Sequence, residues 1–435
     1  MREEGGKSKG WIIVLSAALV VGALGWAMVG GGERGGGSEM GKVKSEKVMR
    51  LQEVTPLGPV VVKGETEKAA ALKELEKKVQ GKGAIPHQAV LTFSNSAAMA
   101  DFLKRAAAEG LVVTGRLDKL RTVRVAYDSL DKLQQELLAH GADISTIGAN
   151  FPVITPSIPS PPTPEQRAGG VGTAPFGDAL MSAIGAGADV DRSQWGSGIT
   201  VAVVDSGVAQ HPSLAEGQVT HIDLVNDGQP FEGHGTAIAS LISGNMDGAQ
   251  GLAPAAKILD VRIANANGTS DSFQLARGIE AALDRGAQVI NISMGSYGDA
   301  PVVAQAVNDA LARGVVIVAA AGNEQAGVKD WPAAYSGVIS VSGVDASGHL
   351  AYFSNSGDPT LGAPAVGIPS AYEQNNQAYL ATGDGTSQAA ALVSGAAAAI
   401  LGQGGDVLST LSKSAKLIPA DQHQAGAGML HLGTK

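Results

Sequence analysis

The chain of 435 residues has no cysteine, few aromatic residues (4%) and few charged residues (17%). The absence of cysteine excludes disulfides, thiolate metal sites, cysteine nucleophiles and iron–sulfur clusters. Serine, threonine, histidine and carboxylate chemistry stay open. Glycine is abundant, with 59 residues, but 44% of the chain is hydrophobic, which indicates globular structure rather than low complexity. The length allows two or three domains.

Charge is divided unevenly along the chain. Residues 1–174 carry 22 Lys and Arg against 18 Asp and Glu, a net charge of +4, whereas residues 175–435 carry 10 against 23, a net charge of −13. No basic stripe with interleaved aromatics is present in the second part. We therefore expect no nucleic acid as a partner.

The amino-terminal region contains a long uncharged segment. Residues 11–29 are 19 consecutive residues without a charge, and as a helix they would span about 28 Å, close to the thickness of a bilayer core. We expect residues 1–37 to be a signal peptide or a retained membrane anchor with a glycine-rich tether, and the protein to be exported. It would face outside the cytoplasm on the membrane, or be secreted if the segment is cleaved. Residues 38–84 are rich in Lys and Glu and are expected to be a polar spacer.

Residues 85–151 show an ordered succession of short patterns that predicts a small domain. Apolar or strand-like runs at 89–93, 111–115, 122–126 and 144–147 alternate with helix-like stretches at 96–109 and 130–140. The order β-α-β-β-α-β is typical of a ferredoxin-like α+β domain with an antiparallel sheet and both helices on one face. The proline-rich residues 152–174 then predict an exposed, extended linker.

From residue 175 to residue 435 the pattern becomes an alternation of strand and helix. Near-continuous apolar runs at 199–204, 257–263, 288–294, 315–321 and 338–342 indicate parallel strands covered on both faces. Helical patterns at 272–285 and 301–313 lie between them, and each is followed by a glycine. The predicted fold is a doubly wound α/β domain with a mostly parallel sheet, whose ligand site is expected at the carboxyl ends of the strands.

Three residues suited to nucleophilic catalysis follow one another in this part. Asp205 ends the first apolar run, His234 opens a helix-like run, and Ser387 precedes a helix of small residues. Each also has an ordinary structural interpretation, as a turn residue, a loop histidine or a helix cap. Their common order, at expected strand ends and helix starts, favours a shared site.

The motifs around these residues resemble those of the subtilisin-like serine proteases (subtilases). They are Asp205-Ser-Gly, His234-Gly-Thr, Ala-Gly-Asn323 and Gly-Thr-Ser387-Gln-Ala, in the chain order Asp, His, Ser. The resemblance covers residues 175–435 and implies a subtilisin-like catalytic domain. It also makes the small domain similar to the family's inhibitory, chaperoning propeptide, so that the chain's own propeptide becomes an expected partner.

The resemblance implies a role for each matching residue. Ser387 would attack the scissile carbonyl of a protein or peptide substrate, His234 would transfer the proton, and Asp205 would orient the imidazole. Asn323 would bind the oxyanion. The segment that contains Ser293 and Gly295 would bind substrate as an added strand. These assignments predict a serine endopeptidase that is made as a self-processed zymogen.

Two further positions bear on specificity and on metals. Asp330 falls near the floor of the family's first specificity pocket, and a carboxylate there would favour Lys or Arg before the cut. The resemblance implies no cofactor and no tight metal site, because Ser213 stands where many relatives have a calcium-binding carboxylate and the loop 243–250 is short. Asp247 leaves weak calcium binding open.

Departures from the family pattern keep an alternative open. Gln388, Ala391 and Leu392 replace residues that many members carry after the nucleophile, and we expect them to alter packing only. A catalytically silent subtilase that acts as a binding or scaffold module is the main alternative. A serine hydrolase of esters or lipids is disfavoured, because Gly-x-Ser-x-Gly and the order Ser, Asp, His are both absent.

Overall fold

The computed structural model describes residues 65–156, 159, 163, 172–229, 233–374 and 377–433. The predicted signal peptide or anchor of residues 1–37 lies outside these ranges. Within them no single helix is long and apolar enough to cross a bilayer, although a bent pair, Thr386–Gly402 with Val407–Ser414, passes the same test when taken together.

The main sheet has seven strands, and all its neighbouring pairs are parallel. Successive residues of a strand face opposite sides: Val201 and Val203 belong to one apolar cluster, and Ala202 and Val204 to the other. Such strands read as continuous apolar runs because both faces are covered. In spatial order they are β15 (Leu361–Pro364), β14 (Ile339–Val344), β13 (Val316–Ala320), β12 (Val289–Ile292), β6 (Thr200–Asp205), β10 (Lys257–Arg262) and β7 (Val219–Asp223).

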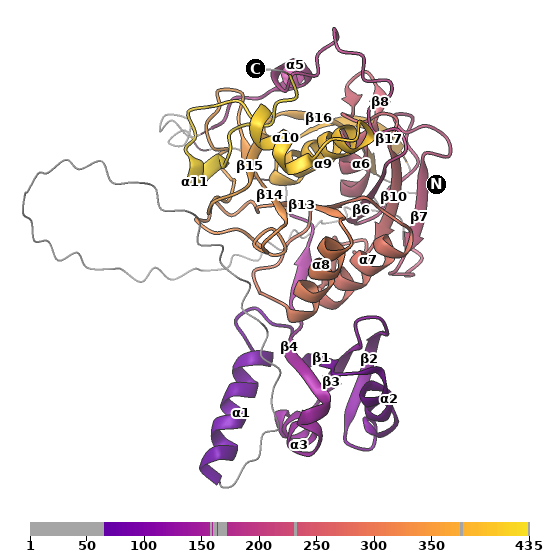
Figure 1. The fold of residues 1–435 in the computed structure, drawn as a ribbon, viewed down its shortest axis with the longest axis vertical. Coiled ribbons are helices and arrows are strands. Elements are labelled where there is room, and N and C mark those ends of the chain that lie inside the picture. Colours follow the sequence, from indigo (N-terminus) through magenta and orange to yellow (C-terminus); the bar gives the residue numbers. More distant parts are fainter. Residues whose placement is uncertain are drawn as a thin grey trace, which may run out of the picture. The chain divides into compact units, whose positions relative to one another are not determined.

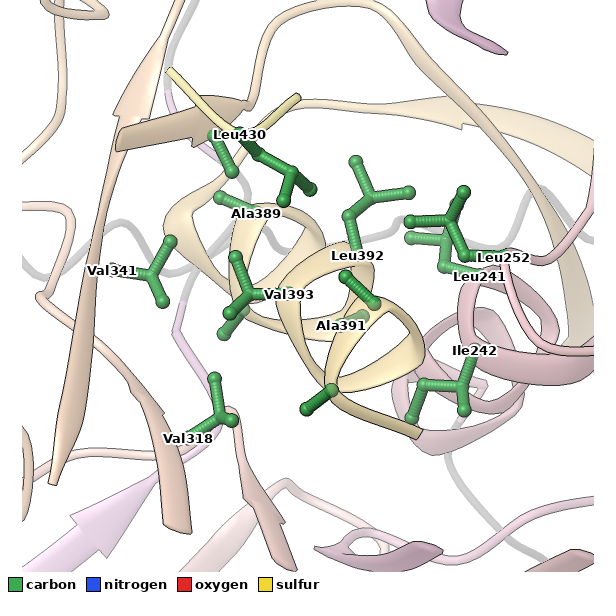
Figure 2. Packing of buried hydrophobic residues seen from close by; sticks show 14 of the residues in the cluster. Leu241, Ile242, Leu252, Val318, Val341, Ala389, Ala391, Leu392, Val393 and Leu430 are labelled. Atoms are coloured by element: carbon green, nitrogen blue, oxygen red, sulfur yellow. The ribbon is translucent and has the colours of Figure 1, made fainter. Parts of the chain in front are cut away.

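Helices cover both faces of this sheet (Figure 1). Helices α6 (His234–Ser243) and α9 (Thr386–Gly402) contribute to the apolar cluster on one face, and α7 (Ser272–Asp284) and α8 (Pro301–Ala312) to the cluster on the other. Figure 2 shows α9 between Val318 and Val341 of the sheet and Leu241 of α6. The predicted doubly wound α/β fold is confirmed, with strand ends one or two residues from those expected.

The strand order creates a switch point beside β6. After β6 the chain places β7 and then β10 on one side of it, and it then crosses to β12 on the other side. In open α/β sheets a crevice opens at the carboxyl ends of the strands where the winding changes direction. Asp205, the last residue of β6, therefore stands at the edge where a site is expected.

Residues 88–149 form a second, antiparallel sheet of four strands in the order β2-β3-β1-β4. Helices α2 and α3 share an apolar cluster with this sheet, and the element order is β-α-β-β-α-β. The elements are β1 (Gln88–Phe93), α2 (Ser96–Arg105), β2 (Leu111–Leu117), β3 (Thr122–Tyr127), α3 (Leu130–His140), the 3₁₀ turn η1 (Gly141–Asp143) and β4 (Ile144–Ala149).

Part of the expected polar spacer, residues 38–84, is instead packed structure. Helix α1 (Glu65–Val79) places Leu75 and Val79, which are 3% and 1% exposed, in the apolar cluster of the small sheet. The helical spacing of Leu75 and Val79 is visible in the sequence, but the many Lys and Glu residues favoured a solvated spacer, because only a narrow side of the helix is buried.

The other face of the small sheet contacts α7 and α8. A Cβ on Gly115 would lie 2.5 Å from the Phe273 ring, and one on Gly148 would lie 2.7 Å from Pro301. Asn150 also joins the two parts, since its Oδ1 accepts a hydrogen bond from Phe273 N at 3.1 Å. Glycine therefore permits close contact between this sheet and the starts of both helices.

The predicted linker begins as a buried strand rather than an exposed tether. Strand β5 (Pro152–Ile154) pairs antiparallel with β11 (Thr269–Asp271), and Val153 is completely buried. The proline-rich composition is compatible with an extended backbone. It does not indicate that the edge of β11 is available to pair with this segment.

The remaining elements are short or lie at the periphery. They are η2 (Gly177–Ala179), α5 (Leu180–Ala183), β8 (Asn245–Met246), β9 (Ala249–Gln250), β16 (Ile368–Gln374), β17 (Gln377–Gly383), α10 (Val407–Ser414) and α11 (Gln422–Ala425).

Candidate active site

Asp205 and His234 are joined by a short hydrogen bond. His234 is the first residue of α6, and its Nδ1 lies 2.8 Å from Asp205 Oδ1, which also accepts a hydrogen bond from Ser206 N at 2.7 Å. The Asp205 side chain is fully buried, and the His234 side chain is 13% exposed. A Cβ at Gly235 would collide with Gly207 O, so glycine after His234 allows α6 to approach the end of β6.

Ser387 lies near the start of α9 and contacts the end of a different strand. Its Oγ donates to Ser293 O at 3.0 Å, and Ser293 Oγ donates to Ser387 O at 3.3 Å. Ile292 of β12 pairs with Val204 of β6. Ser293, directly after β12, and Asp205, the last residue of β6, therefore lie at the same edge of the sheet. The fold thus brings all three candidate catalytic residues to one end of the sheet.

Asn323 follows β13 at this same edge, and its orientation is set by Thr386. Asn323 Oδ1 accepts hydrogen bonds from Thr386 N at 3.0 Å and Thr386 Oγ1 at 2.9 Å. With Oδ1 engaged in this way, Nδ2 is left to donate elsewhere. Ser387 is the second residue of α9, where a backbone N–H has no acceptor within its own helix. Two N–H groups can therefore serve one oxyanion.

Gly295 forms an edge on which an extended segment of the chain is seated. Ile154 N donates to Gly295 O at 3.2 Å, and Gly295 N donates to Ile154 O at 3.3 Å. Thr155 N donates to Gly268 O at 2.8 Å on the opposite side. Gly295 and Gly268 therefore form the two sides of a groove. Residues 152–155 lie in this groove in the way that a peptide is bound by strand addition.

Asp330 lies directly beside Gly295. A Cβ on Gly295 would be 3.2 Å from both Cβ and Oδ2 of Asp330, whose side chain is buried. Asn355 Nδ2 donates to Glu324 Oε2 at 2.8 Å and lies 3.5 Å from Asp330 Oδ1. Burial, then the charge of Glu324 and a hydrogen bond with it, raise the pKa of Asp330 to about 8. The Asp330 carboxyl is therefore mostly protonated at neutral pH.

Comparisons with known proteins agree with this geometry. The Subtilase family profile matches residues 196–417, a range that contains every residue described above from Asp205 to Ser387. This chain belongs to the Subtilase family.

Individual relatives support the assignment. This subtilase is 37% identical over 224 residues to Subtilisin Savinase of Lederbergia lenta, covering 51% of this chain and 82% of that protein. It has the same identity over 224 residues to an alkaline protease of Shouchella clausii, of which the match covers 58%. The enzyme class is therefore that of a subtilisin-like serine endopeptidase.

A solved structure shows the same fold. Fervidolysin from Fervidobacterium pennivorans, a keratinolytic enzyme related to subtilisin, superposes with a TM-score of 0.68 at 24% identity. The alignment covers 90% of this subtilase and 64% of that chain.

Three site residues of this subtilase were missed by the sequence analysis. Thr386 orients Asn323, Asn355 binds Glu324, and Ser206 Oγ accepts a hydrogen bond from Gly235 N at 3.2 Å. Thr386 and Ser206 stand inside the motifs quoted above, so their position was an available signal. Asn355 has no comparable signal, because it reaches the site from a distant loop.

The unusual residues after Ser387 have packing roles in this subtilase. Leu392 and Ala391 are fully buried in the apolar cluster around α9 (Figure 2). Gln388 lies against the turn that precedes Ser387, because a Cβ on Gly383 would be 2.8 Å from its Nε2 and one on Gly385 would be 2.6 Å from its Oε1. The side chains behind Ser387 therefore support the start of α9.

Asp247 is the carboxylate expected to allow weak calcium binding. Its Oδ1 accepts a hydrogen bond from Gln250 Nε2 at 3.2 Å, and it would supply one of the six to eight oxygen ligands that calcium takes. In the described ranges, the group with metal-ligand spacing is Glu109, Glu136 and His140 in the small sheet region. Arg105 already binds Glu136 there at 2.5 Å, so a cation would have to displace it.

Proposed function

We propose that this subtilase hydrolyses peptide bonds in proteins or peptides with Ser387 as nucleophile, His234 as proton carrier and Asp205 as the group that orients His234. The observation that carries the proposal is the 2.8 Å contact between His234 and Asp205, at the sheet edge where Ser387 contacts Ser293. His234 would take the Ser387 proton during attack and pass it to the leaving amine. An acyl-enzyme intermediate would form and then be hydrolysed by water.

Substrate binding would use the same edge. A peptide would add as a strand to Ser293 and Gly295, and the oxyanion would be bound by Asn323 Nδ2 and the backbone N–H of Ser387. The seating of residues 152–155 on Gly295 supports this path for the substrate backbone.

The same seating supports synthesis as an inhibited zymogen, and we propose that Ser387 itself then performs the processing. The small antiparallel sheet, our candidate propeptide, continues directly through Asn150 into β5, which lies in the groove. A groove filled by the chain's own segment is closed to other peptides until cleavage within residues 150–175. The uncharged residues 11–29 would direct the protein through a membrane, where it stays anchored or is released.

A fluorophosphonate probe, which reacts with activated serines, tests the proposal. We expect labelling of the processed protein, mapped by mass spectrometry to the peptide that contains Ser387. Ser414→Ala, on the neighbouring helix α10, should label like the unchanged protein. Absence of labelling after processing would instead support the catalytically silent alternative.

The oxyanion assignment predicts a loss of rate without a loss of affinity. Asn323→Ala should lower kcat by about 100- to 1,000-fold, because one oxyanion donor has an effect of that size, while KM changes little. Thr386→Val keeps Asn323 but removes the hydroxyl that orients it, so its kcat should fall less. Steady-state kinetics on a peptide anilide measure both. An equal rise in KM with unchanged kcat would contradict the assignment.

The acid pair beside Gly295 predicts a preference for Lys or Arg before the cut that depends on pH. Asp330 would ionise as pH rises through about 8, so the ratio of kcat/KM for an Arg substrate to that for a Leu substrate should increase between pH 7 and pH 9. Asp330→Asn should lower the ratio at pH 9 by about tenfold to a hundredfold, since hydrogen bonds to charged groups contribute about 1.5 to 3 kcal/mol. Asp247→Asn, at an exposed loop acid, is the control. A flat profile, or Leu preferred by both variants, would refute the preference.

A further inference from the structure

The strand pairing of residues 152–155 with Gly295 can be extended residue by residue to Ser293, the residue that Ser387 contacts. Ile154 and Gly295 exchange both of their backbone hydrogen bonds, at 3.2 and 3.3 Å, and form an antiparallel bridge. In such a pairing, each step forward on one strand is a step back on the other, and hydrogen-bonded pairs recur every second residue. The next hydrogen-bonded pair after Ile154 and Gly295 is therefore Pro156 and Ser293.

Side-chain burial agrees with this register. Val153 is completely buried among residues of the main body, whereas Ile154 is 41% exposed. Alternate side chains thus point into and out of the groove, as in a strand. The segment is anchored by Val153 and by three backbone hydrogen bonds of Ile154 and Thr155.

Residue 156 is a proline, so the backbone hydrogen bond expected at this position of the ladder cannot form. Proline has no N–H, so it cannot donate to Ser293 O as the register requires. Ser293 O accepts the hydroxyl of Ser387 instead, at 3.0 Å. A hydroxyl has one proton, and while Ser293 O holds it the same proton is not directed at His234.

We propose that Pro156 makes the seated segment a blocking strand rather than a substrate, so that the peptide bond between Pro156 and Ser157 resists self-cleavage. This inference rests on the proposed peptidase function. A residue with an N–H at position 156 would donate to Ser293 O and so hold its own carbonyl carbon beside Ser387.

The cleavage that Pro156 would prevent is an ordinary acyl transfer to Ser387. Cleavage would form a bond between Ser387 Oγ and the Pro156 carbonyl carbon and break the bond from that carbon to the Ser157 nitrogen. The Ser387 proton would pass through His234 to that nitrogen, and water would later hydrolyse the ester. The missing Pro156 N–H acts on the first of these steps, by leaving the Pro156 carbonyl carbon unanchored at Ser293 O.

The experiment compares self-cleavage in the full chain and three variants. Unchanged protein, Pro156→Ala, Pro159→Ala as the matched control, and Pro156→Ala combined with Ser387→Ala are followed by intact-mass spectrometry for products that begin at Ser157. We expect Pro156→Ala to form them at least tenfold faster than the unchanged protein and Pro159→Ala, and the double variant to form none.

A second measurement leaves the fold untouched. Synthetic peptides of residues 150–160 with Pro or Ala at position 156 are offered to the processed enzyme, and we expect cleavage after position 156 only in the Ala peptide, with the Pro peptide acting as a competitive inhibitor. The inference is overturned if both peptides are cut there at rates within twofold of each other, or if neither is. Fluorophosphonate labelling in parallel distinguishes failure of this inference from failure of the proposed peptidase function. If the unchanged, processed protein is not labelled, the proposed function itself is wrong.

Discussion

Ser387→Ala is expected to abolish peptidase activity, with a fall in kcat of about a millionfold, a magnitude established for subtilisin rather than derived from this chain. The reason is that covalent attack in the proposed mechanism needs the Ser387 hydroxyl. The same variant should accumulate as the unprocessed full-length chain, because the zymogen proposal makes processing a reaction of this site.

Two measurements check this expectation. Hydrolysis of a peptide anilide gives kcat, and mass spectrometry of the amino terminus shows whether processing occurs. Ser414→Ala should behave like the unchanged protein in both. If Ser387→Ala matures normally, another protease performs the processing. If it also keeps its peptidase activity, the nucleophile has been assigned incorrectly.

Asp205→Asn is expected to lower kcat by about 10,000-fold with little change in KM, an effect of the size known for this triad position. Asp205 Oδ1 lies 2.8 Å from His234 Nδ1, so a carboxylate there requires the proton on Nδ1 and leaves the other ring nitrogen to accept the Ser387 proton. An amide can donate to Nδ1 instead, which favours the wrong tautomer. It also lacks the negative charge that stabilises the imidazolium formed during attack.

A second buried carboxylate provides the matched control for Asp205. Asp260 lies on the neighbouring strand β10, is 1% exposed, and binds His221 Nδ1 at 2.9 Å. Asp260→Asn therefore removes a second Asp–His interaction, whose histidine is 51% exposed and is not a candidate catalytic residue. It should leave kcat within a few-fold of the unchanged value. Equal losses in the two variants would mean that the effect of Asp205→Asn reflects the fold rather than catalysis.

Much of the main body was predictable because its signals are local. A strand covered on both faces is apolar at every position, so β6, β12 and β13 are visible as continuous runs. The polar residues that follow them, Asp205 and Asn323, were then placed correctly at the sheet edge by the parallel topology alone.

The predictions failed where a segment's partner lies far away in the sequence. Residues 38–84 read as a polar spacer, yet α1 buries Leu75 and Val79. Residues 152–174 read as an exposed linker, yet Val153 is buried and β5 pairs with β11. The composition of such a segment reflects its solvent-facing residues, which are the majority. It does not indicate which strand edge or apolar surface its few buried residues will contact.

The sequence by itself determined the α/β class and the family and indicated Asp205, His234 and Ser387 as candidate catalytic residues, because periodicity and short motifs are properties of neighbouring residues. The tertiary structure alone decided that Thr386 orients Asn323, that Asn355 binds Glu324 beside Asp330, and that the chain's own segment is seated on Gly295. These relations depend on hydrogen bonds of about 3 Å between residues remote in sequence. Such distances are set only when the strands, helices and loops have packed together.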